Sequence, residues 1–226
     1  LEKRRVFQVR ELTKKLPETS PMKYLKQAKN IEHSGDNAIV PQVEAILAQI
    51  SKDRENAVRF YAEKFDNWEG DFVLSTEKKA ALIEQVPDQV KSDLRFAHDR
   101  IRKFAEAQRE SLKDFEQEIS PGVLLGQRVV PVSCAGCYVP GGRFSHAASA
   151  LMSVTTAKVA GVPTVLACSP PHQGSINPAI AYAMELGGAD VILEMGGVHA
   201  IATLARGFFT GKSADIIVGP GTAYVA

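Results

Sequence analysis

The side chains of this sequence with the most reactive chemistry are its three cysteines, Cys134, Cys137 and Cys168. The first two form a C-x-x-C pair in "SCAGCYV", a spacing found in half of a zinc site or in a redox pair. No second C-x-x-C or H-x-x-H follows to complete a zinc site, and the pair ends an apolar strand rather than opening a helix. We therefore expect buried packing cysteines. So few cysteines also suit a reducing compartment, which predicts a cytoplasmic location.

Glycine and proline gather in four short segments, "PGGR", "SPPHQGS", "GGVHA" and "GPGTA". Glycine lets the backbone approach a ligand closely, and a helix that starts just beyond it offers free N–H groups to a phosphate. Segments of this kind can also be plain turns. Several of them along one edge of a sheet would favour a nucleotide or anion site, although the G-x-G-x-x-G fingerprint of ordinary Rossmann domains is absent.

Arg143 and His146 directly follow the first of these glycine pairs. An arginine fork near the start of a helix can hold a sulfonate or phosphate, so both residues are candidate contacts to a substrate or anion. The alternative is that they are solvated surface residues. His146 is a poor candidate for a zinc ligand, because no second ligand follows three or four residues later on its helix.

The second half of the chain alternates short apolar runs with helical segments, which predicts a parallel sheet covered on both faces. Right-handed crossovers would bring the carboxyl ends of the strands, and with them the glycine-bearing segments, to one edge. The predicted strands are 137–139, 164–168, 191–195 and 215–219, and the predicted helices are about 145–160, 177–187 and 198–207.

The first half of the chain has the pattern of helices. The apolar periodicity of "PQVEAILAQISKDRENAVRFYAEKF" is broken at the charged "SKDRE". Ser75 is the expected N-cap of a helix that runs to about Gln85, and a longer helix is expected from about Asp88 to Gln117. The later run "VLLGQRVVPV" is rich in β-branched and aliphatic residues and predicts a strand.

The charge balance excludes two classes of partner. The formal net charge is +1 with 23% charged residues, which favours neither nucleic acid nor an acidic membrane surface. No run of eighteen apolar residues occurs, and the N-terminal residues lack the apolar core of a secretory signal. Met22 is a candidate start, with the residues before it an upstream extension. Neither nucleic acid nor a membrane is therefore expected as a partner.

Several motifs together resemble the histidinol dehydrogenase family in order and spacing. They are "KFDNW", "CYVPGG", "AKVAGV", "ACSPP", "GGVHAIA" and the closing "GPG" with "AYVA", and the resemblance covers about residues 40–226. Details such as "GGRFSHAASALMSVTTAKVAGV" are closer to the branch that oxidises dihydroxypropanesulfonate (sulfopropanediol) than to the histidine-biosynthetic enzymes.

The resemblance implies an α/β fold. We expect a helical N-terminal region and an incomplete Rossmann-like domain, into which a second, small parallel-sheet Rossmann-like domain is inserted. On this basis residues 1–39 form an N-terminal extension and helical segment. Residues 40–137 form the helical part of the larger domain, which ends in a strand, and 138–226 form the Rossmann-like NAD-binding domain.

The resemblance also assigns site residues. Tyr138 matches the family's NAD-contacting tyrosine, while His199 and Thr222 stand where the family has a glutamine and an asparagine that contact NAD. Both replacements keep a hydrogen-bonding group but change its reach. The alternatives are that Tyr138 is a half-buried aromatic side chain and that His199 is satisfied by backbone or water. The family's zinc ligands and its Glu-His acid/base pair are expected beyond residue 226, so we expect no catalytic or metal-binding residue in this chain.

The implied function is that of an NAD- and zinc-dependent oxidoreductase. Such enzymes oxidise a primary alcohol through an aldehyde to a carboxylate, as from L-histidinol to L-histidine, and act as homodimers. Oxidation of 2,3-dihydroxypropane-1-sulfonate and the role of a non-catalytic nucleotide-binding fragment remain open alternatives. We expect the 226 residues alone to be inactive.

Overall fold

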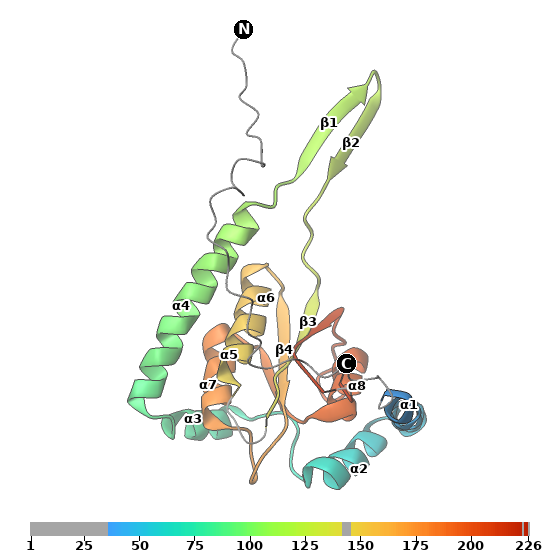
Figure 1. The fold of residues 1–226 in the computed structure, drawn as a ribbon, viewed down its shortest axis with the longest axis vertical. Coiled ribbons are helices and arrows are strands. Elements are labelled where there is room, and N and C mark those ends of the chain that lie inside the picture. Colours follow the sequence, from blue (N-terminus) through green and yellow to red (C-terminus); the bar gives the residue numbers. More distant parts are fainter. Residues whose placement is uncertain (1–35, 142–145, 223, 226) are drawn as a thin grey trace, which may run out of the picture. The chain divides into compact units, whose positions relative to one another are not determined.

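A computed structural model describes residues 36–141, 146–222, 224 and 225 of the chain (Figure 1). These residues belong to one compact unit that spans Gly35–Ala226. Within this part of the chain, no helix combines the length and the apolar character needed to cross a membrane. The predicted N-terminal segment 1–39 lies almost wholly outside the described residues.

A four-stranded parallel sheet forms the centre of the unit, in the order β5-β4-β3-β6. Its strands are β3 (Cys134–Tyr138), β4 (Thr164–Ser169), β5 (Val191–Glu194) and β6 (Ile216–Val218). Both β4 and β6 pair with β3 in parallel, and β5 pairs with β4. The predicted mixed α/β fold with a parallel sheet is therefore confirmed. The domain boundary suggested after residue 137 falls inside β3.

Helices cover both faces of this sheet, because its strands are apolar on both sides. Two groups of buried side chains, one on each face, form the core. The first face carries α3 (Thr76–Glu84), α4 (Asp88–Glu110), α7 (Pro178–Gly187) and the run of α5 (Ala147–Ala150), a π-helical turn (Leu151–Thr155) and α6 (Thr156–Val159). The second face carries α1 (Asp36–Asp53), α2 (Glu55–Asp66) and α8 (Gly197–Arg206).

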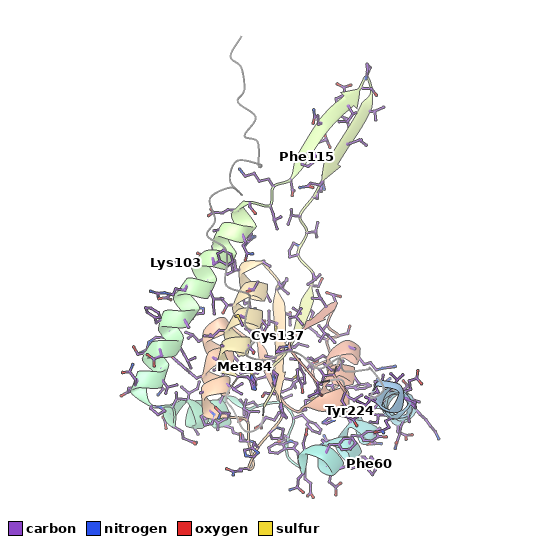
Figure 2. The ribbon with its side chains drawn as sticks, viewed as in Figure 1. Phe60, Lys103, Phe115, Cys137, Met184 and Tyr224 are labelled. Carbon is purple, nitrogen blue, oxygen red and sulfur yellow. The ribbon has the colours of Figure 1, made fainter. Side chains whose placement is uncertain are left out.

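The two faces separate the cysteines of the C-x-x-C pair. Cys134 packs in the core on the α8 side of β3, and Cys137 packs in the core on the α7 side. Residues three apart on a strand point to opposite faces, so these thiols cannot close on one metal ion. Figure 2 labels Cys137 in the interior together with Met184, whereas Phe60 and Phe115 lie on the outside. Burial raises the pKa of the Cys137 thiol to about 11, which keeps it protonated. The prediction of packing cysteines is confirmed.

The helix boundaries of the first half follow local signals in the sequence. Helix α1 gives way to α2 at Arg54, whose φ of 52° interrupts the helical backbone inside "SKDRE". The hydroxyl of Ser75 accepts a hydrogen bond from the Lys78 amide at 3.1 Å, so the predicted N-cap of α3 is confirmed. The next helix, α4, starts directly after Pro87.

The predicted end of the long helix near Gln117 is wrong. Helix α4 ends at Glu110, and residues 115–120 form the strand β1 (Phe115–Ser120), which pairs antiparallel with β2 (Val123–Gln127). The two apolar residues of β1, Phe115 and Ile119, are four positions apart and so share one face of the strand, and Gly122 with a φ of 78° makes the turn. The hairpin is exposed along its whole length and stands away from the parallel sheet in Figure 1.

Candidate functional site

The four glycine-bearing loops converge at the carboxyl edge of the sheet. A Cβ atom on Gly141 would lie 2.7 Å from Cγ of Pro170, and one on Gly196 would lie 2.5 Å from Cβ of Pro170. The loop after β6 meets the same edge, since a Cβ on Gly219 would overlap the carbonyl oxygen of Tyr138. The predicted gathering of these loops at one edge is confirmed. Here their glycines allow the loops to pack against one another.

Tyr138 ends β3 at the middle of this edge and is buried. Its hydroxyl oxygen accepts a hydrogen bond from the Gly197 amide at 3.2 Å. Burial raises the pKa of the phenol, with the Gly197 hydrogen bond acting in the opposite direction. The hydroxyl therefore keeps its hydrogen at neutral pH and can donate it. No acceptor for that hydrogen is found among the described residues.

His199 lies in the first turn of α8 and is 1% exposed. Its Nε2 is 3.0 Å from Oδ2 of Asp66, the last residue of α2. The other ring nitrogen, Nδ1, is buried and has no hydrogen-bond partner among the described residues. A Cβ on Gly197 would lie 3.9 Å from this Nδ1, so His199 and Tyr138 flank the same turn.

Side chains already occupy the backbone amides at the starts of α7 and α8. Oδ2 of Asp66 accepts from the Gly196 amide at 3.1 Å, and Tyr138 takes the Gly197 amide. At α7 the Asn177 side chain accepts from the Ala179 amide at 2.9 Å. The expectation of free amides for a phosphate is therefore wrong at the start of α7 and, at α8, for the Gly196 and Gly197 amides. At α8 the Asp66 carboxylate would also repel an incoming anion.

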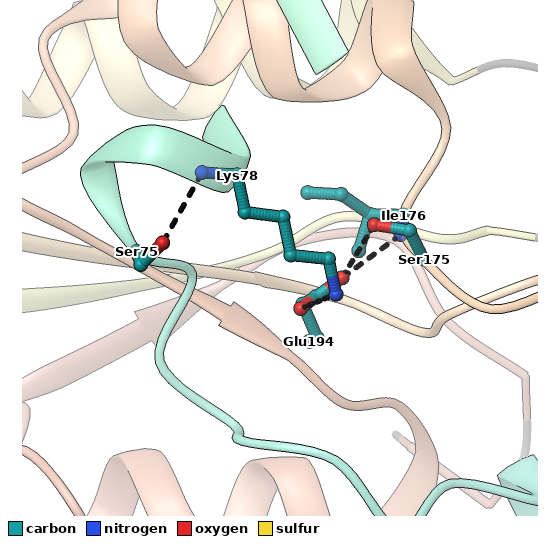
Figure 3. A network of polar contacts seen from close by, with 5 residues as sticks. All are labelled: Ser75, Lys78, Ser175, Ile176 and Glu194. Carbon is teal, nitrogen blue, oxygen red and sulfur yellow. Dashed lines mark hydrogen bonds and ion pairs between the residues drawn. The ribbon is translucent and has the colours of Figure 1, made fainter. Parts of the chain in front are cut away.

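A second polar cluster lies beside these loops, at the carboxyl end of β5 (Figure 3). Glu194 is 1% exposed, and its Oε2 is 2.6 Å from the Lys78 ammonium. Its Oε1 accepts from the Ser175 hydroxyl at 2.7 Å and from the Ile176 amide at 3.2 Å. Lys78 also lies over the ring of Trp68, with its Nζ 4.5 Å from the ring centroid. The cluster ties α3 to the loop between β4 and α7.

Lys78 reaches Glu194 because the linker between α2 and α3 runs along the outer edge of β5. The Leu74 amide donates to the Ile192 carbonyl at 2.9 Å, and the Glu194 amide donates to the Phe72 carbonyl at 2.8 Å. These bonds place the start of α3 next to the end of β5. A hollow of about 230 Å³ is lined by residues of the loop between β4 and α7, among them Pro170, Ser175 and Asn177, together with Gly141. It has room for a sugar or a phosphate, but not for a whole dinucleotide.

The remaining predicted site residues are less enclosed. His146 is the N-cap of α5, and its carbonyl oxygen accepts from the Ser149 amide at 2.9 Å, while its side chain makes no cap hydrogen bond. Thr222 is exposed, and its carbonyl oxygen accepts from the Val225 amide at 2.8 Å. Arg143 lies outside the described residues.

Asp66 and Glu194 are the site residues that sequence reasoning did not single out. A lone acid inside the apolar run "VILEM" is a signal, because a buried carboxylate requires a partner. Asp66 stands in "KFDNW", which contributes to the family resemblance but carries no assigned role. Neither partner could be predicted, since Lys78 and His199 lie more than a hundred residues away along the chain.

The described residues fit the two expected cofactors unequally. The free hydrogen of the Tyr138 hydroxyl and the unpartnered Nδ1 of His199 fit hydrogen bonds to a dinucleotide. Zinc does not fit this part of the chain, because no three His, Cys, Asp or Glu side chains gather among the described residues.

Comparison with protein families gives one match over most of the chain. The family model described as "Histidinol dehydrogenase" matches residues 29–226. The sulfopropanediol 3-dehydrogenase of Ruegeria pomeroyi is 48% identical over 206 residues, which cover 91% of this chain and 47% of that protein. The histidinol dehydrogenase of Methanococcus maripaludis is 40% identical over 190 residues, or 84% of this chain and 45% of that protein.

Comparison with solved structures also finds a histidinol dehydrogenase. The crystal structure of the histidinol dehydrogenase from Elizabethkingia anophelis superimposes with a TM-score of 0.77 at 29% sequence identity. The match covers 89% of this chain and 45% of that one. The chain thus spans about half the length of the relatives it matches.

Proposed function

Because the chain belongs to the histidinol dehydrogenase family, we propose that it forms the dinucleotide-binding part of an NAD-dependent dehydrogenase. The observation that supports this most is the meeting of Tyr138 and His199 at the Gly196–Gly197 turn, on the carboxyl edge of a parallel sheet. Bound NAD would supply the hydride acceptor for oxidation of an alcohol through an aldehyde to a carboxylate. The residues of this chain would bind and orient it: Tyr138 donates a hydrogen bond, and His199 offers Nδ1.

The zinc dependence that the family resemblance implies is a proposal about residues beyond Ala226. Since the described residues hold no cluster of three ligands, we assign no step of the reaction to a metal here. The catalytic acid and base are proposed to lie in the part of the relatives' length that this chain does not cover. Accordingly we propose that the 226 residues bind the dinucleotide but do not turn over substrate.

Two substrates follow from the names of the relatives. L-Histidinol is the substrate of the family's namesake enzymes, and a relative named sulfopropanediol 3-dehydrogenase has the higher identity, 48% against 40%. The higher identity supports keeping 2,3-dihydroxypropane-1-sulfonate, which carries a sulfonate group, as a second candidate substrate beside L-histidinol. Arg143, which follows "PGG" in the sequence, is then the proposed sulfonate contact, together with His146 three residues later.

The assay for this proposal uses the protein in a form extended to the length of its relatives. NADH absorbance is followed with L-histidinol and with 2,3-dihydroxypropane-1-sulfonate, each with and without a chelator. We expect one of the two alcohols to be oxidised and the chelator to abolish the activity. Turnover of histidinol alone would exclude the sulfonate candidate, and no NADH from either alcohol would contradict the dehydrogenase proposal.

A binding role without catalysis is the alternative from a different class. His199 and Thr222 favour this non-catalytic nucleotide-binding fragment, because they stand where the family has a glutamine and an asparagine that contact NAD. The same assay separates the two functions, since a protein that only binds forms no NADH.

The assembly and location of the protein are further proposals. We propose a homodimer on the basis of the family resemblance. An apolar groove of about 680 Å³ beside β6 supports contact with a further protein surface, because its lining includes the exposed side chains of Val130, Met152 and Ile216. A cytoplasmic location is supported by the buried, unpaired cysteines.

A further inference from the structure

Asp66 connects two elements of the site that are far apart in sequence. It ends α2, and its side chain is 13% exposed at the start of α8. One of its oxygens, Oδ2, accepts from the Gly196 amide at 3.1 Å and lies 3.0 Å from Nε2 of His199. The proposed function so far gives this carboxylate no task.

The contact with Asp66 fixes the histidine ring. A carboxylate only accepts hydrogen bonds, so the nitrogen that faces it, Nε2, must carry a hydrogen. The ring is thereby held with Nδ1 facing the Gly197 side of the turn. A nitrogen buried without a partner lowers stability, and a ligand that bonds to it would recover that loss.

The same carboxylate fixes the glycine turn. Gly196 has no room for a side chain against Pro170, and Gly197 has a φ of 57°, a conformation that favours glycine. With the Gly196 amide held by Asp66, the next amide points at the Tyr138 hydroxyl oxygen. Because the hydroxyl oxygen accepts there, its own hydrogen is directed away from the turn.

We propose that Asp66 is a positioning residue, which holds the Gly196–Gly197 turn and His199 so that the Tyr138 hydroxyl donates its hydrogen to an oxygen of the dinucleotide. This inference rests on the proposed function, because it requires that Tyr138 contacts the dinucleotide. The acceptor is an uncharged oxygen of a ribose or carboxamide, since the Asp66 carboxylate opposes a phosphate at this position.

The test is a calorimetric titration of the 226-residue protein with NAD in a double-mutant cycle. Asp66→Ala should weaken NAD binding about tenfold in the parent, equal to about 1.4 kcal/mol, and by a smaller factor of about threefold in a Tyr138→Phe background, where only the part that acts through His199 remains. A role that only stabilises the fold would give no such coupling. Asp66→Asn keeps an oxygen that can accept both hydrogen bonds, so it should bind NAD within about threefold of the parent.

Two further variants complete the design. Glu63→Ala removes an exposed acid from the same helix and should leave NAD affinity unchanged. Asp66→Glu keeps the charge but moves the oxygen by one methylene, so it should lose affinity as the alanine variant does. If Asp66→Ala does not fold, Asp66→Glu replaces it in the double-mutant cycle.

The outcomes separate the inference from the function beneath it. If the parent binds NAD and the Asp66 variants bind it equally well, Asp66 has no positioning role while the proposed function stands. If Asp66→Ala weakens binding by the same factor with and without the Tyr138 hydroxyl, Asp66 does not act through Tyr138. If the parent does not bind NAD at all, the proposed function and this inference both fail.

Discussion

Replacing Glu194 by alanine is expected to lower the free energy of unfolding by about 2 to 3 kcal/mol. The substitution takes the acceptor away from the Ser175 hydroxyl and the buried Ile176 amide, and it removes the partner of Lys78. Lys78 is 38% exposed and can turn to water, so most of the cost comes from the hydroxyl and the amide. Urea unfolding of the parent and the variant measures the difference.

The matched control for Glu194 is Glu185 of α7. It pairs with Lys79, which follows Lys78 in α3. Its Oε2 is 2.5 Å from Nζ of Lys79, but its side chain is 43% exposed. Glu185→Ala should therefore cost less than about 1 kcal/mol. Equal losses for the two variants would show that burial of Glu194 and its bonds to the loop before α7 do not stabilise the fold.

Replacing Gly207 by alanine is expected to cost about 3 kcal/mol, the other large effect. Gly207 is the C-cap of α8 with a φ of 70°. A Cβ there would lie 2.6 Å from the carbonyl carbon of Lys212 and 2.7 Å from the Ser213 amide nitrogen. Both neighbours are backbone atoms, so the chain that leads from α8 to β6 would have to move.

Gly211 is the control that separates the effect of the steric clash at Gly207 from the effect of its left-handed backbone conformation. It has the same φ of 70° in the same connection, but a Cβ there would meet nothing within 4 Å. Gly211→Ala should therefore cost only the left-handed conformation, about 1 kcal/mol. Thermal unfolding of both variants tests this, and a Gly207 variant no less stable than the Gly211 variant would contradict the packing of this turn.

The parallel sheet was predictable because its signals are local. Each strand is a short apolar run, each following helix has its own periodicity, and the crossover rule then fixes the edge on which the loops meet. Tyr138 and His199 could be placed near each other on that basis, since both lie just beyond or at a strand end. The family resemblance added the names of the ligand contacts.

The errors had two sources. The charges of the segment after Glu110 suit a helix, but β1 at residues 115–120 pairs with β2 in a local hairpin across the turn at Gly122. The amides at the start of α8 looked free because Asp66, which occupies one of them, comes from 130 residues earlier. Long-range pairings of this kind leave no periodic trace in a sequence.

Figure 3 shows why such a pairing matters for the site. Lys78 and Glu194, distant in sequence, hold the loop of Ser175 against the end of β5. The loops of a nucleotide site must keep one geometry to bind with useful affinity. A carboxylate under each of two loops, the buried Glu194 and the partly buried Asp66, supplies that rigidity in this chain.

The central claim is that the carboxyl edge around the Gly196–Gly197 turn binds a dinucleotide, and an NMR titration of the 226-residue protein with NAD tests it most directly. We predict that the amide signals of Gly196, Gly197 and Tyr138 shift with added NAD, while those of the exposed strand β2 stay in place. Binding of NAD without shifts at this turn, or no binding at all, would contradict the claim.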